Sequence, residues 1–335
     1  MHTTWMPTKI GLTLGKYAPF HLGHKFVIDT ALSEMDRVIV MVYEDDITPI
    51  PVQTRANWIR KLFPSVEVIE CKDGPQTVGY TPEIMEIQEA YILKVVGNRR
   101  ITHFYSSENY GAHVSKALGA VDRRVDQARD ALDISATEIR TDAYRHRAFV
   151  PDIVYRDLVT KVVFLGAEST GKTTIAKELA RRFCTEYVPE YGATYWYGHQ
   201  QDMRLTPAQL VEIAKGHVEI EDRQILASNK YCFIDTNAIT TYMYANDYHG
   251  YAMPELKVLA DSCRCRYDIT FLCEDDIPYD DTWDRRGIAQ RAESQMKLTD
   301  ELVRRGIPFY VLRGDVDVRV QAVEEYLRLY KKVAQ

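Results

Sequence analysis

The stretch that decides the fold is Gly166-Ala167-Glu168-Ser169-Thr170-Gly171-Lys172-Thr173, near the middle of the 335-residue chain. The apolar run 161–165 precedes it and is expected to be a buried parallel strand, and residues 175–180 after it have a helical pattern. A Gly-x4-Gly-Lys-Thr loop between a strand and a helix surrounds phosphate oxygens with backbone N–H groups and a positive helix end. The sequence therefore predicts a P-loop, with Lys172 on the β- and γ-phosphates of ATP and the Thr173 hydroxyl on Mg²⁺.

Residues around this loop complete a predicted kinase site. The apolar strand 231–235 ends at Asp235, the place for a carboxylate that would hold Mg²⁺ together with Thr173. Either Glu190 or Asp235 would accept the proton of the attacking hydroxyl. The expected ATP-binding residues of this half are Gly166, Glu168, Ser169, Thr170, Gly171, Lys172, Thr173 and Thr174.

The Asp- and Arg-rich loop 280–287 has two interpretations. It is either a solvated charged loop or the lid of a small-molecule kinase, in which Arg285, Arg286 or Arg291 would offset charge on the transferred phosphoryl group. The nearby aromatic residues are mostly expected to pack in the core, but Tyr191 or Trp196 would offer a face to a cationic ring of the substrate.

The composition is that of an ordinary globular enzyme, with 46% hydrophobic and 27% charged residues. A net charge of −6 gives no electrostatic reason to expect a nucleic-acid surface. The start of the chain lacks the apolar core of a signal peptide, no apolar run approaches membrane-spanning length, and the six Cys have no metal-ligand spacing. We therefore expect a cytoplasmic protein with free thiols.

The first half of the chain alternates apolar strands with helical segments, which predicts an open parallel sheet with helices on both faces. We expect a first domain over residues 1–150, a linker over 151–160 and the P-loop domain over 161–335. The expected strands of the first domain cover 10–14, 36–43, 66–71 and 102–106, with a fifth beginning near 120. Ligands of such sheets bind beyond the carboxyl ends of the strands.

Two loops at that edge carry phosphate-binding side chains. His21 and His24 flank Leu-Gly at the start of a helix, where both rings can donate hydrogen bonds to phosphate oxygens. Alone, such a pair is more often found on a surface or at a helix cap. Ser135, Thr137 and Arg140 open a later helix and provide a second phosphate-binding helix start.

These motifs carry a family resemblance. Gly15-x3-Pro19-x-His21-x-Gly23-His24 and Ile134-Ser135-x-Thr137-x2-Arg140 resemble the HxGH and ISxTxxR signatures of the nucleotidylyltransferase superfamily. The segment 106–111 resembles the SSExYG-type segment of nicotinamide-nucleotide adenylyltransferases. Together with the P-loop domain, essentially the whole chain is similar to the NadR-type bifunctional enzymes.

The resemblance implies a Rossmann-like nucleotidylyltransferase domain followed by a P-loop kinase domain. The kinase would phosphorylate nicotinamide riboside, and the first domain would transfer an adenylyl group from ATP to the mononucleotide, giving NAD and pyrophosphate. ATP and Mg²⁺ are the implied cofactors. The implied site residues of the first domain are Gly15, Lys16, His21, Gly23, His24, Ser135, Thr137 and Arg140 for ATP, and Ser107, Glu108 and Tyr110 for the nicotinamide nucleotide.

Three alternatives stay open. In the first, the adenylyltransferase domain is weak or silent, since the stretch 79–96 lacks the Trp that related adenylyltransferases often place against nicotinamide. The same layout also occurs in phosphopantetheine adenylyltransferase joined to dephospho-CoA kinase, and a nucleotide-sensing regulator would bind ATP and NAD without turnover. The expected partners are small molecules, in a chain that could form a homo-oligomer; DNA binding is not expected, because only about ten residues precede the first strand.

Overall fold

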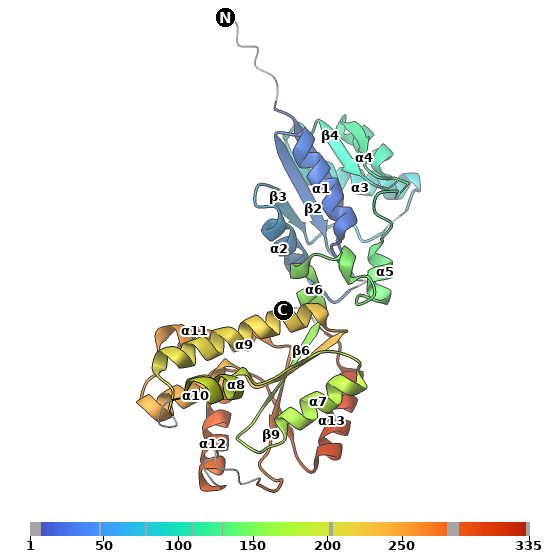
Figure 1. Ribbon diagram of the computed structural model, residues 1–335. Coiled ribbons are helices and arrows are strands. Elements are labelled where there is room, and N and C mark those ends of the chain that lie inside the picture. The colour runs from blue at the N-terminus through green and yellow to red at the C-terminus, as the bar shows by residue number, and fades with distance from the viewer. Residues whose placement is uncertain are drawn as a thin grey trace, which may run out of the picture. The chain divides into compact units, whose positions relative to one another are not determined.

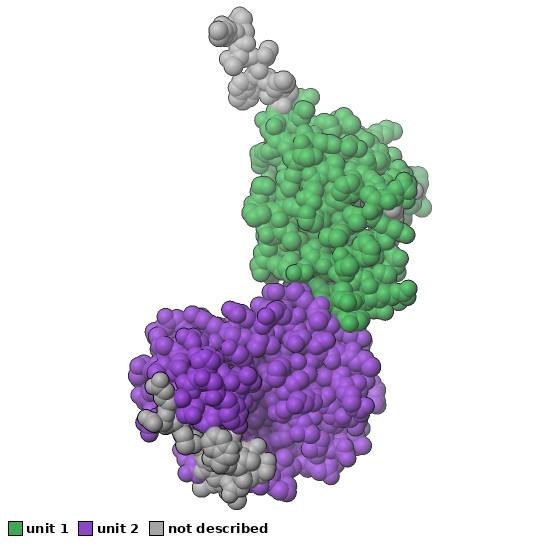
Figure 2. Space-filling model, viewed as in Figure 1, with its two compact units in different colours: residues 1–155, 333–335 green, residues 156–332 purple. Residues whose placement is uncertain are grey.

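The computed structural model describes residues 8–46, 48–77, 79–108, 110–128, 130–200, 204–279 and 288–332. The chain divides into two compact units between residues 155 and 156, which Figure 2 shows in separate colours. Within the described residues, each unit is built on a five-stranded parallel sheet. This arrangement confirms the predicted fold class of two parallel α/β domains.

Unit 1 alternates strands and helices along its length (Figure 1). Its strands are β1 (Ile10–Gly15), β2 (Arg37–Tyr43), β3 (Glu67–Cys71), β4 (His103–Ser106) and β5 (Val121–Arg124). Its α-helices are α1 (Leu22–Glu34), α2 (Val52–Leu62), α3 (Pro82–Val96), α4 (Gly111–Leu118) and α5 (Ala136–Thr141), followed by the 3₁₀ turn η1 (Arg147–Phe149). Both faces of the sheet are covered, which is why its central strands are apolar almost throughout.

The helices of unit 1 form separate layers. Leu12 and Phe104 of the sheet pack with Ile92 of α3 and Val114 of α4 in one core cluster. Helix α1 buries Val27, Ile28 and Ala31 and contacts β1, β2 and β4. These apolar contacts fix the carboxyl ends of the strands at one edge of the sheet.

The strand order β3-β2-β1-β4-β5 places a topological switch point between β1 and β4. The chain leaves β1 toward β2 and β3, then crosses back to β4, so the connections diverge on either side of this point. In open parallel sheets such a divergence leaves a crevice at the carboxyl ends of the two strands. Gly15 and Ser106 end these strands, so the crevice lies where both predicted binding loops begin.

Unit 2 has the strand order β10-β9-β6-β8-β7. Its strands are β6 (Thr160–Leu165), β7 (Tyr187–Val188), β8 (Tyr231–Asp235), β9 (Ile269–Cys273) and β10 (Tyr310–Leu312). Its helices are α7 (Lys172–Arg182), α8 (Tyr191–His199), α9 (Pro207–Ala227), α10 (Ala238–His249), α11 (Pro254–Arg266), α12 (Ile288–Arg304) and α13 (Val316–Leu329).

A row of phenylalanines forms the centre of unit 2. The Phe164 ring lies 5.6 Å from Phe271 and 6.2 Å from Phe233, centroid to centroid, on three adjacent strands. Residues of α7 and α13 complete this core cluster. Because β6 is the middle strand, the loop that follows it emerges between the ends of β8 and β9.

The segment 151–160, the expected linker, contains helix α6 (Asp152–Leu158). Pro151 is compatible with a helix start, and its carbonyl accepts the N–H groups of Val154 and Tyr155 at 2.9 Å. Strand β7 is only two residues long, and helix α8 begins directly after Glu190. None of the described helices combines the length and apolar character needed to cross a membrane.

Candidate active sites

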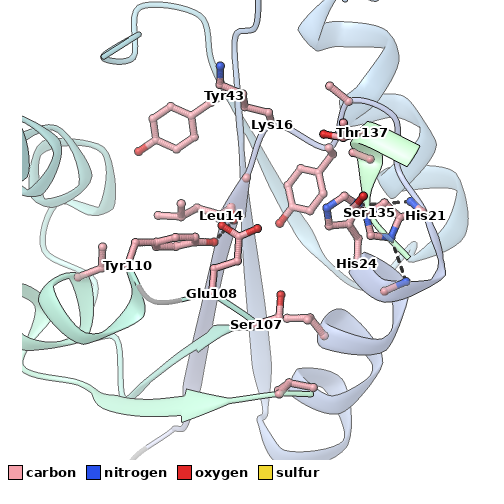
Figure 3. A pocket seen from close by; sticks show the side chains of 18 of the residues that line it. Leu14, Lys16, His21, His24, Tyr43, Ser107, Glu108, Tyr110, Ser135 and Thr137 are labelled. Atoms are coloured by element: carbon pink, nitrogen blue, oxygen red, sulfur yellow. Dashed lines mark hydrogen bonds between the residues drawn. The ribbon is translucent and has the colours of Figure 1, made fainter. Parts of the chain in front are cut away.

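Unit 1 contains a pocket of about 660 Å³ at the carboxyl ends of β1 and β4 (Figure 3). Three segments that are far apart in sequence contribute to its wall: the loop after β1, the loop after β4 and the start of α5. Residues at the end of β2 and on α3 also line it. Every residue that the sequence predicted for the first site lines this pocket. They are Gly15, Lys16, His21, Gly23, His24, Ser107, Glu108, Tyr110, Ser135, Thr137 and Arg140.

The two histidines are fixed at the start of α1. His21 is the N-cap, and its Nδ1 accepts the Gly23 N–H at 3.1 Å. The Nδ1 of His24 accepts the His21 N–H at 3.3 Å, and the two rings stack with centroids 3.7 Å apart. Since both Nδ1 atoms accept backbone protons, each neutral ring carries its own proton on Nε2. The pair therefore presents two Nε2–H donors from one helix start.

Burial keeps His24 neutral. It lowers the pKa of the His24 imidazole well below its ordinary value of 6.5, and the neighbouring His21 lowers it further. A neutral imidazole with a fixed tautomer can donate one hydrogen bond to a phosphate oxygen without exchanging a proton during a reaction. The geometry suits orientation and charge stabilisation better than acid–base chemistry.

The start of α5 is tied to the loop after β1. Arg140 donates to the Ala18 carbonyl at 2.6 Å and to the Thr137 hydroxyl at 2.8 Å. Ser135 caps the helix by accepting the Glu138 N–H at 3.2 Å, while its hydroxyl donates to the Glu138 carboxylate at 2.6 Å. The two predicted phosphate-binding helix starts thus lie side by side, and Arg140 joins them.

Two charged residues that the sequence motifs did not indicate, Asp45 and Arg55, hold Lys16 in place. The Lys16 ammonium contacts Asp45 at 3.2 Å, and the side chain of Asp45 is fully buried. Arg55 of α2, also fully buried, donates to the carbonyls of Lys16 and Tyr43, the latter at 2.7 Å, and to the Glu44 carboxylate at 2.9 Å. A lone Arg on an amphipathic helix has no sequence signal that distinguishes it from a surface residue.

The loop after β4 forms the opposite wall of the pocket. The Tyr110 hydroxyl donates to the Leu14 carbonyl at 3.1 Å, and Arg124 donates to the Glu108 carbonyl. In Figure 3, the Glu108 carboxylate points toward the middle of the pocket, and Ser107 lies between it and the histidines. The predicted substrate residues therefore face the predicted ATP residues across one cavity.

The P-loop of unit 2 has the backbone that its glycines allow. Gly166 has φ 152°, and an added Cβ would lie 2.6 Å from the Cys273 carbonyl, while Gly171 has φ 81° at the start of α7. The Lys172 ammonium donates to the Ala167 carbonyl at 2.8 Å. Two other predicted loop residues make side-chain hydrogen bonds: the Thr170 hydroxyl donates to the Ala167 carbonyl at 2.8 Å, and the Glu168 carboxylate accepts from Tyr244 at 3.3 Å. Ser169 has φ 60°, and Thr174 is exposed on the first turn of α7.

Side chains from two other helices hold this loop. Arg319 of α13 is buried and donates to the Thr170 carbonyl at 2.7 Å. Gln295 of α12 accepts the Ala167 N–H at 2.8 Å and donates to the Cys273 carbonyl at 3.0 Å. Arg291, which was predicted to act as a lid residue, donates to the Ser169 carbonyl at 3.0 Å. Arg285 and Arg286, the other predicted lid residues, lie outside the described residues.

Thr173 and Asp235, the two residues predicted to hold magnesium, lie in contact. The Thr173 hydroxyl donates to Asp235 Oδ2 at 2.5 Å, and the other oxygen, Oδ1, is buried without a hydrogen-bond partner in the structure. Within the described part of the chain, no group of three or more His, Cys, Asp or Glu side chains forms a metal cage. Mg²⁺ commonly uses one or two protein ligands with phosphate oxygens and water, and an unpaired carboxylate oxygen beside a hydroxyl fits that mode.

Glu190 lies close to the same centre. Burial raises the pKa of the Glu190 carboxyl, and the negative charge of Asp235 raises it further, while Lys172 and His217 oppose the shift. The next residue, Tyr191, packs its ring against Gly216 of α9, where an added Cβ would lie 2.4 Å from the ring. Trp196 lies further along α8, edge-on to Tyr197 at 5.4 Å.

Taken together, these sites define a two-unit ATP-dependent transferase, with a nucleotidylyltransferase-type unit followed by a P-loop kinase-type unit. Comparison with known families agrees: residues 12–142 match the family described as Cytidylyltransferase-like, and residues 161–319 match the family described as AAA domain.

Over nearly its whole length the chain is similar to the NadR proteins of NAD biosynthesis. It is 29% identical to the "Trifunctional NAD biosynthesis/regulator protein NadR" of Salmonella typhimurium, over 95% of this chain and 83% of that protein. The NadR protein of Escherichia coli K12 is also 29% identical, over 95% and 82%. A crystal structure of NadR in complex with NAD and AMP-PNP shares the fold with a TM-score of 0.56 and 22% identity, covering 97% of this chain and 98% of that one. The resemblance predicted from the motifs is confirmed, as is a bifunctional transferase.

Another relative covers only about half of the chain. A "Probable nicotinate-nucleotide adenylyltransferase" of Thermotoga petrophila is 27% identical over 48% of this chain and 97% of that protein.

Proposed function

We propose that unit 2 phosphorylates nicotinamide riboside with ATP and that unit 1 adenylates the resulting mononucleotide to NAD. The observation that carries this proposal is the joint presence, in one chain similar to NadR over nearly its whole length, of a complete P-loop and an intact His21–His24 pair. The product of one unit is the substrate of the other, which gives a chemical reason for their fusion.

In unit 2 the 5′-hydroxyl oxygen of the riboside attacks the γ-phosphorus of ATP. The new O–P bond forms as the bond to the β–γ bridging oxygen breaks, so that ADP leaves and the hydroxyl proton passes to a carboxylate. Lys172 and the backbone N–H groups of the P-loop bind the phosphates and stabilise the charge that shifts during transfer.

Glu190 is our choice for the base. Asp235 already accepts the Thr173 hydroxyl in the place of a magnesium-holding carboxylate, whereas Glu190 precedes α8, next to Tyr191. Glu190→Gln should lower kcat of riboside phosphorylation by about 10²- to 10⁴-fold. Glu178→Gln, which changes an exposed carboxylate of α7 paired with Arg181 and Arg182, should leave kcat unchanged. Equal activity of Glu190→Gln and wild type would exclude Glu190 as the base.

Magnesium fits beside Thr173 and Asp235, and it would neutralise charge on the β- and γ-phosphates when bound with ATP. Asp235 would bind it through its unpaired Oδ1, directly or through water. Thr173 would turn its hydroxyl oxygen toward the same space. The proposal that this chain uses Mg²⁺ is supported by these two side chains and by the proposed use of ATP.

In unit 1 a phosphate oxygen of the mononucleotide attacks the α-phosphorus of ATP. The bond to the pyrophosphate oxygen breaks as the new P–O–P bond forms, and no proton has to be removed from the attacking phosphate dianion. The Nε2–H groups of His21 and His24, with Lys16 and Arg140, align the phosphates and stabilise the developing charge.

The pocket favours the amide form of the pyridine nucleotide over the acid. Among the described residues that line it, Lys16 and Arg140 are the only Lys or Arg, and both belong to the phosphate-binding group. The Glu108 carboxylate would repel nicotinate but accept a hydrogen bond from a carboxamide. Glu108→Gln should therefore raise kcat/KM for nicotinate mononucleotide relative to the amide by about tenfold; an unchanged ratio would remove Glu108 as the discriminating residue.

The test of the function is an end-point assay with nicotinamide riboside, ATP and Mg²⁺, in which products are separated by chromatography. The wild-type protein should form NAD. Lys172→Ala should abolish NAD formation from riboside but retain it from mononucleotide, and His24→Ala should accumulate mononucleotide from riboside.

Other outcomes would separate the alternatives. Mononucleotide without NAD would mean an active kinase beside a silent first unit. No consumption of riboside would overturn the proposed kinase, and phosphopantetheine and dephospho-CoA would then be the substrates to test. Tight NAD binding without any turnover would indicate a sensing role.

A further inference from the structure

Tyr17 follows Lys16 in the loop after β1 and lines the pocket of unit 1. It has φ 50°, a left-handed conformation that is unusual for a bulky residue and that tends to occur at functional sites. Its ring lies over the backbone of Gly15, where an added Cβ would be 3.3 Å from Tyr17 Cζ. The backbone thus holds the ring at the end of β1 rather than letting it point to solvent.

The ring is fixed by aromatic neighbours on the phosphate-binding side. It meets the His24 ring edge-on, with centroids 4.9 Å apart and an interplanar angle of 73°, and it lies 5.9 Å from Phe20. Tyr17 is also close enough to Tyr110 to add to the effect of burial in raising the pKa of that phenol. Tyr17 therefore stands between the histidines and the loop that carries Glu108 and Tyr110.

The hydroxyl of Tyr17 is the unusual feature. The side chain is only 3% exposed, yet its hydroxyl has no hydrogen-bond partner in the structure. A buried polar atom without a partner is costly and is rarely retained without a reason. Burial raises the pKa of the phenol well above its ordinary value, and a polar contact with the Thr13 side chain lowers it by less, so the hydroxyl keeps its proton.

We propose that the Tyr17 hydroxyl is a catalytic hydrogen-bond donor to the phosphoryl group transferred in unit 1. This inference rests on the proposed adenylyl transfer. A mononucleotide bound with its pyridine ring near Glu108 and an ATP held by the histidines would bring their reacting phosphates together beside Tyr17. As the attacking oxygen bonds to the α-phosphorus and the pyrophosphate oxygen leaves, charge shifts over the phosphoryl oxygens, and the hydroxyl donates to one of them without losing its proton.

The ligand thus supplies the acceptor that the protein does not. A hydrogen bond to a charged group contributes more than one between neutral groups, and a donor fixed before the reaction needs no reorganisation. The aromatic contacts with His24 and Phe20 would remain without the hydroxyl. The Tyr17→Phe variant therefore removes the proposed donor and leaves the packing in place.

The experiment compares kcat and KM of Tyr17→Phe and wild type for adenylyl transfer from ATP to nicotinamide mononucleotide. The expected result is a kcat about 10- to 100-fold lower, with both KM values within about twofold of wild type. Riboside phosphorylation by the same preparation should be unchanged. The melting temperature should not fall, because no hydrogen bond within the protein is lost.

Tyr105→Phe is the matched control. Tyr105 is also buried in unit 1, but its hydroxyl donates to Glu34 at 2.8 Å and does not line the pocket. This variant should lose stability and keep its kcat.

A Tyr17→Phe kcat within about twofold of wild type would overturn the inference while leaving adenylyl transfer established, and so would a rise in KM alone. Failure of the wild-type protein to form NAD from mononucleotide would overturn the proposed function, and the role of Tyr17 with it.

Discussion

The Thr173 hydroxyl donates to Asp235 Oδ2 at 2.5 Å, although 62 residues separate the two in sequence. This contact joins the first turn of α7 to the end of β8 and leaves Asp235 Oδ1 as a buried, unpaired acceptor. It links the P-loop to the one carboxylate that ends a neighbouring strand, so the two side chains can bind one cation together.

Asp235→Asn should separate the two functions of the chain. The amide would keep the shape of the side chain but lose the negative charge that favours Mg²⁺, so riboside phosphorylation should fall by about 100-fold or more and require more Mg²⁺. A magnesium titration of initial rates tests this. Adenylyl transfer from mononucleotide by the same protein is the control, and a wild-type magnesium dependence in the variant would contradict the assignment.

Arg55 should be essential to unit 1 although it lies outside the pocket. Arg55→Met would leave the carbonyls of Tyr43 and Ile50 without their buried donor, and the Lys16 carbonyl would lose its contact with Arg55. We therefore expect the free energy of unfolding to fall by about 2 to 5 kcal/mol and most of the adenylyl transfer activity to be lost. Hydrogen exchange of the β1 and β2 amides measures the stability of unit 1 alone.

The control for Arg55 is on the same helix. Arg60 makes an exposed ion pair with Glu70 at 2.8 Å, and such pairs contribute about 0 to 1 kcal/mol. Arg60→Met should therefore change little. Similar losses in the two variants would mean that Arg55 acts only through general helix packing.

His24 should make the stability of unit 1 depend on pH. Its pKa is well below 6.5 in the folded state and near 6.5 when unfolded, so only the unfolded chain takes up this proton as the pH falls below about 6.5. The contribution of His24 to the free energy of unfolding is therefore fully present above pH 6.5. It is lost as the pH falls toward the folded-state pKa, by up to about 1.4 kcal/mol per pH unit.

His24→Asn keeps an acceptor for the His21 N–H but cannot titrate. Its stability, followed by hydrogen exchange of β1 and β2 between pH 8 and pH 5, should decline less than that of wild type below pH 6.5. Parallel declines would show that His24 is not the titrating group.

The parts of this structure that the sequence predicts are those set by local pattern. Apolar runs indicate the central strands, and glycine-containing motifs at their ends mark both phosphate sites. In the P-loop, Gly166 and Gly171 have the positive φ values that favour glycine. Contacts between residues that are far apart in sequence have no such local pattern. From sequence alone, Arg55 resembles a surface residue of α2, and Gly216 is an ordinary helix glycine. The burial of the Tyr17 hydroxyl likewise depends on where the folded chain places its ring.

Gly216 lies within helix α9, where a glycine lowers stability by about 1 kcal/mol relative to alanine. A specific contact must therefore favour glycine at this position. The reason is Tyr191, whose ring occupies the space of a Cβ, with Cε1 only 2.4 Å away. Gly216→Ala should displace Tyr191 and, with it, the adjacent Glu190. We expect KM for riboside to rise about tenfold, with KM for ATP and adenylyl transfer unchanged.

Gly198→Ala in α8, where a Cβ meets nothing within 4 Å, is the matched control and should behave as wild type. If Gly216→Ala also leaves KM for riboside unchanged while Tyr191→Ala raises it, the Tyr191 ring tolerates the shift and Gly216 does not position it.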